Sequence, residues 1–138
     1  MASSLYAKGR EKCLSNVLSN SIGWDSDEDV RVMLVKSTYS FADSDEFVVD
    51  LGSNDNGRSA SLTTLTSTNG IADAADISLV ATSAVACNAL VLFVHTGADA
   101  TAPLLGYIDT ATGLPITPGA GATINIVWAS TTNKIFKL

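Results

Sequence analysis

The sequence predicts a mainly-β fold, a β-sandwich or small β-barrel of about seven strands with one N-terminal α-helix. Apolar residues recur at helical spacing only near the start of the chain. Beyond residue 29 they either alternate or run continuously over short stretches, which is typical of strands. Turn signals rich in Gly, Asn and Pro separate these stretches. Because no internal repeat or linker is visible, we expect one domain over residues 1–138.

Residues 3–19 are predicted to form the helix, because one stripe of side chains recurs at helical spacing. The stripe consists of Tyr6, Arg10, Cys13, Leu14, Val17 and Leu18, whereas Lys8, Glu11 and Lys12 lie on other faces. A helix this short is marginal alone in water, so the stripe must dock on the chain's own sheet or on a neighbouring subunit. The predicted interface residues are Tyr6, Arg10, Leu14, Val17, Leu18 and Trp24.

In the first half of the chain, residues 30–35 predict a strand with both faces covered, and residues 47–51 predict a second short strand. Residues 39–46 are polar and acidic and predict an exposed loop. In the polar stretch that follows, Asn56-Gly57 and Asn69-Gly70 predict turns. Leu62 and Leu65 suggest a further strand between these turns, although their spacing does not alternate cleanly.

In the second half, residues 89–94 are continuously apolar and predict the central strand of the core. Strands are also predicted at residues 77–81, 104–109 and 123–128, with turns at 110–115 and 118–121. Residues 134–138 are predicted to add a final edge strand.

The composition favours a subunit that assembles with other proteins. The chain has 46% hydrophobic and 16% charged residues, against about 25% charged residues in an average soluble domain, and its mean hydropathy is +0.27. Such a surplus leaves apolar patches exposed, and these usually mark protein–protein contacts. The net charge of −6 argues against binding to nucleic acid or to an anionic membrane.

No targeting or membrane segment is predicted. The first ten residues have no apolar core of a signal peptide. The longest apolar run, residues 84–94, is too short to span a bilayer. We therefore expect synthesis in a cytoplasm without an export signal of its own.

The sequence predicts no catalytic residue and no cofactor. It has one histidine, His95, and no P-loop, dinucleotide-binding or zinc-binding spacing. A nucleophilic pair of Cys87 and His95 is an alternative, but Cys87 begins an apolar strand, where a thiolate is disfavoured. Two cysteines are too few for a disulfide framework, so Cys13 and Cys87 are expected to be free thiols in a reducing cytoplasm.

The acidic residues Asp25, Asp27 and Asp29 resemble the start of a calcium-binding loop. The pattern then fails, because Val30 stands where such a loop needs Gly and Lys36 where it needs Glu. We therefore expect a solvated turn and no metal site. A looser cation site that adds Asp43, Asp45 or Glu46 remains an alternative.

Several blocks resemble a family of small virion structural proteins of tailed bacteriophages. They are residues 5–12 (Leu-Tyr-Ala-Lys-Gly-Arg-Glu-Lys), 22–24, 30–35, 107–115, Trp128 and residues 133–138. Residues 52–86 do not share the resemblance, and Cys13 stands where the family has a large apolar residue. The resemblance implies a virion protein that leaves the cell by lysis.

From small size, composition and β-richness we infer a capsid decoration or cement protein on the capsid surface. Its expected partners are the major capsid protein and further copies of itself, as a dimer or trimer. The first alternative is a tail component, either a tube or a fibre-attachment subunit. The second is a glycan-binding module that uses Trp24 as a stacking platform.

Overall fold

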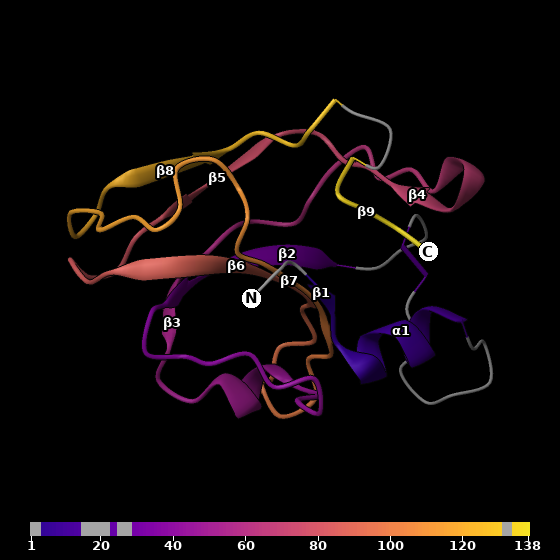
Figure 1. Ribbon diagram of the computed structural model, residues 1–138, viewed down its shortest axis with the longest axis horizontal. Coiled ribbons are helices and arrows are strands. Elements are labelled where there is room, and N and C mark those ends of the chain that lie inside the picture. The colour runs from indigo at the N-terminus through magenta and orange to yellow at the C-terminus, as the bar shows by residue number, and fades with distance from the viewer. Residues whose placement is uncertain (1–3, 15–22, 25–28, 131–133) are drawn as a thin grey trace.

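A computed structural model describes residues 4–14, 23–24, 29–130 and 134–138 of the chain (Figure 1). As predicted, the fold is mainly β, with one short helix near the N-terminus. A five-stranded antiparallel sheet has the order β1-β7-β6-β2-β3. Its strands are β1 (Ser4–Leu5), β2 (Val30–Lys36), β3 (Asp55–Arg58), β6 (Cys87–Val94) and β7 (Leu104–Ile108).

Two smaller sheets form a second layer. One pairs β5 (Ile77–Val80) with β8 (Thr123–Ile126), and the other pairs β4 (Ile71–Ala72) with β9 (Phe136–Lys137). Figure 1 shows both on the same side of the five-stranded sheet. Over the described part of the chain the sheets do not close into a barrel, so the architecture is sandwich-like.

The five-stranded sheet is buried on both faces, because alternate residues of its central strands enter two separate apolar clusters. From β2, Val32 and Leu34 face the second layer, and Met33 and Val35 face the opposite side. Strand β6 lies between β2 and β7 and is buried over almost its whole length. The predictions of a doubly covered strand at 30–35 and a central strand at 89–94 are therefore confirmed.

The second apolar cluster is covered by aromatic side chains and by a short 3₁₀ helix, η1 (Val48–Leu51). The prediction of a strand at residues 47–51 is wrong. The Asp50 carboxylate accepts hydrogen bonds from the amides of Glu46 and Phe47, both at 2.9 Å, which stabilises a turn in place of an extended strand. The three-residue spacing of Val48 and Leu51 then places both in the core.

The prediction of a turn at Asn56-Gly57 is also wrong, because both residues belong to β3. Gly57 has a φ of 130°, and a Cβ atom there would lie 2.2 Å from the carbonyl oxygen of Val80. Asn56 is fully buried, and its amide group exchanges hydrogen bonds with the main chain and hydroxyl of Ser83. Asn56 and Gly57 therefore hold β3 against the end of β5 and the residues that follow it.

The remaining turn and strand predictions are mostly confirmed. Asn69-Gly70 lies in the tight turn η2 (Thr68–Gly70), where Asn69 has a φ of 57°. Strands β5, β6, β7, β8 and β9 lie within or around the ranges expected for them. The exception is the strand suggested by Leu62 and Leu65. Between residues 59 and 67 the structure has only isolated bridges, from Ser59 to Leu79 and from Thr66 to Asp73.

Candidate interaction surface

Helix α1 (Ala7–Leu14) packs directly on β7. It is shorter than predicted at its start, because Ser4–Leu5 forms β1, and residues 15–19 lie outside the described part of the chain. Gly9 allows the close approach: a Cβ atom on it would lie 2.8 Å from the carbonyl oxygens of both Leu104 and Leu105. The amide of Tyr6 donates a 3.1 Å hydrogen bond to the Leu105 carbonyl and fixes the chain just before the helix.

A second attachment holds α1 to the segment before η1. Lys12 was expected on a face away from the docking stripe, but it is only 4% exposed and lies on the buried face of the helix. Its Nζ donates to Oε1 of Glu46 at 2.6 Å and lies 4.5 Å from the centre of the Phe47 ring. The buried face of α1 therefore consists of Gly9 and Lys12, and the described part of the helix docks on its own subunit.

Two of the predicted interface residues are core residues. Tyr6 is fully buried, and its hydroxyl lies 3.0 Å from that of Tyr39, which donates to Asp45. Burial raises the pKa of Tyr6 above its usual range and that of Tyr39 to about 12. Trp24 is buried, donates from Nε1 to the Asp73 carbonyl and packs edge-on against a second aromatic ring. A buried indole offers no stacking platform for a sugar.

The other predicted interface residues do not form an apolar stripe in the described part of α1. Arg10 donates to the Leu5 carbonyl at 2.6 Å, and its guanidinium lies 3.6 Å from the Asp43 carboxylate. Leu14 is 77% exposed at the end of the helix. Val17 and Leu18 lie outside the described residues. Of the predicted interface, Arg10 and Leu14 are therefore the side chains that the structure places on the surface.

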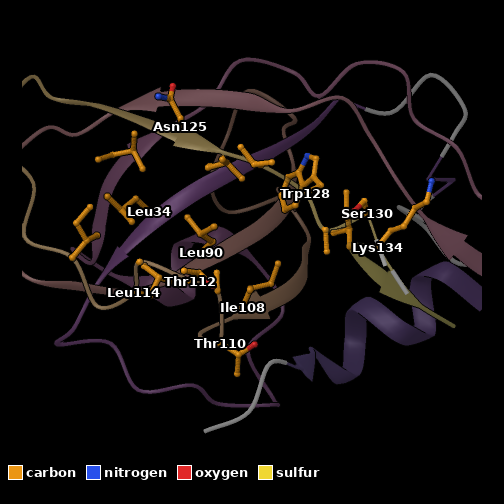
Figure 2. Close-up of a pocket in the computed structure, with 18 of the residues that line it drawn as sticks. Leu34, Leu90, Ile108, Thr110, Thr112, Leu114, Asn125, Trp128, Ser130 and Lys134 are labelled. Atoms are coloured by element: carbon orange, nitrogen blue, oxygen red, sulfur yellow. The ribbon is translucent and has the colours of Figure 1, made fainter. Parts of the chain in front are cut away.

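A different surface feature is a groove of about 910 Å³ between the two layers (Figure 2). Leu34, Leu90 and Ile108 of the five-stranded sheet line one side. Ile124 and Ile126 of β8 line the other, and the 110–116 loop, Trp128 and Ile135 complete the lining. Among the described residues of the lining, Lys134 alone is charged, and it is paired with Asp73 at 2.6 Å.

Alternation within the predicted strand at residues 123–128 puts Ile124, Ile126 and Trp128 on one face, but it does not show that this face is left partly uncovered. The Trp128 indole is held by a 3.1 Å hydrogen bond from Nε1 to the Ala75 carbonyl. The Trp128 amide donates to the Asp76 carboxylate at 2.9 Å. These bonds fix the chain that continues from β8 along the groove.

Neither Cys87 nor His95 is among the residues that line this groove. Cys87 and His95 stand at opposite ends of β6, so they form no nucleophile pair. Both cysteines are free, as predicted; burial raises the pKa of the Cys13 thiol to about 11 and also raises that of Cys87.

The acidic residues considered for a cation site contact other side chains of the chain. Asp43, Asp45 and Glu46 contact Arg10, Tyr39 and Lys12 respectively. Asp29 forms an ion pair with Arg31 and accepts a hydrogen bond from Ser61, while Asp25 and Asp27 are outside the described residues. Within the described ranges, no three His, Cys, Asp or Glu side chains gather as a metal site.

None of the helices that the structure describes is long and apolar enough to cross a membrane. Comparison with known proteins finds no matching family model, no matching curated protein and no matching solved structure.

Proposed function

We propose that the chain is a structural protein of a tailed-bacteriophage virion and acts as a capsid decoration or cement protein. In this role it binds the lattice of the major capsid protein and stabilises the head. The observation that carries the proposal is the almost uncharged groove on a chain with only 16% charged residues. An apolar hollow of this kind is suited to protein–protein contact. The virion setting comes from the sequence resemblance.

The way the chain is held together supports a binding role. Helix α1 is fixed by the close contact at Gly9 and by the ion pair of Lys12 with Glu46. The five-stranded sheet is buried on both faces. A rigid scaffold of this kind loses little conformational entropy when it binds, and many modest contacts repeated over a symmetric lattice add up through avidity.

The test compares virions with and without the protein. Heads that lack it should assemble normally but release their DNA at a lower temperature, and purified protein added back should restore their resistance. Heads that are equally resistant but fail to adsorb to cells would contradict the decoration role.

The tail alternative is distinguished by position and copy number. Density repeated over the whole head surface supports decoration, whereas density confined to one vertex supports a tube or fibre-attachment subunit. A groove variant, Leu114→Asp, should lose binding to the head if the groove contacts the lattice. Val49→Asp is a matched control, because Val49 is an exposed aliphatic residue outside the groove lining.

A further inference from the structure

Strand β8 forms the outer edge of the second layer. Among the described residues its only strand partner is β5. Strand β5 is covered on its other side, where Leu79 bridges to Ser59 just after β3. The layer therefore ends at β8, and the groove opens beside it.

The hydrogen-bond pattern shows which groups of β8 point outward. The amide of Ala81 donates to the Ala122 carbonyl at 2.9 Å. Two residues along each strand, Leu79 faces Ile124, and this pair has the same hydrogen-bonding position in the ladder as Ala81 with Ala122. Because paired and unpaired positions alternate in an antiparallel ladder, Ile124 bonds toward β5. The main-chain groups of its neighbours, Thr123 and Asn125, therefore point toward the open edge.

The open edge of β8 lacks the features that keep edge strands apart. Monomeric proteins protect such edges with charges, proline, bulges or very short strands. Residues 123–129, Thr-Ile-Asn-Ile-Val-Trp-Ala, contain no charge and no proline, and Val127 is 74% exposed. The other outer strands that the structure describes are protected: β3 begins with Asp55 and ends with Arg58, and β1, β4 and β9 have two residues each.

We propose that β8 pairs with β8 of a second copy of this chain, antiparallel about a two-fold axis that passes beside Asn125. Asn125 then faces the partner's Asn125, and Thr123 faces the partner's Val127. The β5-β8 sheets of the two copies then join into one four-stranded sheet. Such a contact is self-complementary, as two-fold symmetry requires.

Charge limits where two copies of the chain can meet. The chain carries a net charge of −6, so two copies repel each other over much of their surface. The uncharged edge of β8 lets two copies meet without placing like charges opposite each other.

The pairing also explains the uncovered groove. In Figure 2 Asn125 points away from the groove, while Leu34, Leu90 and Ile108 lie on the far side of it. A two-fold axis perpendicular to the joined sheet keeps the inner faces of both copies on the same side. Ile124 and Ile126 of both copies then form one apolar surface, which continues over the open side of each groove. The inference uses the same groove as the proposed head-binding role, so the dimer would present the joined apolar surface to the head. The solution measurements below test the pairing alone, whereas the stability of heads tests the role.

The test measures the mass of the purified protein in solution over a concentration series. We expect the wild type to have twice its chain mass of 14.3 kDa. Asn125→Pro removes the outward amide, which has no main-chain partner among the described residues, so this variant should fold and shift to 14.3 kDa. Asn125→Thr is the matched control: it keeps the amide and should remain a dimer.

Hydrogen exchange locates the contact. The amide of Asn125 should exchange slowly in the dimer and quickly on dilution. If Asn125→Pro does not fold, Asn125→Lys replaces it, because it sets two like charges opposite each other at the axis. A monomeric wild type, a trimer, a dimer that persists in a folded Pro or Lys variant, or an unprotected Asn125 amide in the dimer would each overturn the proposal.

Discussion

Replacing Gly9 by alanine tests whether α1 is seated on β7 as the structure describes. Alanine favours a helix over glycine by about 1 kcal/mol, so the change should stabilise an exposed helix. Here the new Cβ atom would lie 2.8 Å from two carbonyl oxygens and 3.0 Å from the Cα atom of Leu105. All three atoms belong to a strand that is bonded to β1 and β6, so none can rotate away.

Forcing an extra methyl group into a packed contact costs about 1–3 kcal/mol. After the gain in helix propensity, we expect Gly9→Ala to lower the free energy of unfolding by about 1 kcal/mol. For a chain of this size, that loss corresponds to a fall of about 3–5 °C in the melting temperature. Thermal unfolding followed by circular dichroism measures it directly.

The matched control is Gly119→Ala. Gly119 has nothing within 4 Å of the added Cβ atom and no positive φ. Alanine there reduces the entropy of the unfolded chain, so stability should be unchanged or higher by up to about 1 kcal/mol. If Gly9→Ala raised the melting temperature as much as this control, α1 would not be docked on β7.

Three further predictions concern other contacts. Asn56→Ala should lower the free energy of unfolding by about 3 kcal/mol, because it removes several hydrogen bonds that the fully buried Asn56 amide makes with Thr82 and Ser83; chemical denaturation measures the loss. Glu46→Gln should destabilise the protein more than Lys12→Met, because it leaves a buried cation without its counter-charge, whereas Glu46 is partly exposed and can be hydrated; urea denaturation compares the two. Hydrogen bonds from the amides of Phe47 and Glu46 lower the pKa of Asp50, so the stability from this carboxylate is present above its unfolded pKa of about 3.9 and is lost as the pH falls through its lower folded pKa.

Each of these has a control. Asn54→Ala removes an amide that is only partly buried and should cost less than Asn56→Ala; an equal loss would contradict the role of burial. For the ion pair, each variant is the control for the other. If Lys12→Met lost more unfolding free energy than Glu46→Gln, the cation itself would stabilise the fold. For Asp50, the urea midpoint of Asp50→Asn should fall less than that of the wild type between neutral pH and about pH 2. If the urea midpoints of the two proteins fell by the same amount, the lowered pKa of Asp50 would not contribute to stability.

The parts of the fold that the sequence predicted are those with a strong local signal. Residues 89–94 are apolar throughout, and an unbroken run of this length fits a strand buried on both faces. The pattern at residues 30–35 gave the same correct result. In both cases the side chains alone determine the burial, and no distant partner is needed to interpret them.

The errors occur where a distant contact overrides the local signal. Lys12 was expected on a face away from the docking stripe, yet Glu46 and Phe47, more than thirty positions away, hold it on the buried face of the helix. Asn56-Gly57 is a frequent turn pair, but here the glycine serves the close approach of β3 to Val80. The helical stripe included Tyr6, although the helix begins one residue later.

The groove was not predicted because it depends on how the two layers are spaced. The alternation of Ile124 and Ile126 identifies an inward face but not whether that face is fully covered. The unprotected edge of β8 can be found in the sequence only once the strand is known to lie at an edge.

The order of strands in the main sheet has a consequence for folding. Strand β1 and helix α1 come first along the chain, but they dock on β7, about one hundred residues later. During synthesis β1 and α1 therefore lack the strand on which they dock until residues 104–108 have left the ribosome. Contacts of such long sequence separation slow folding. Until β7 arrives, this segment is exposed to non-native association, and chaperones that bind nascent chains would act there first.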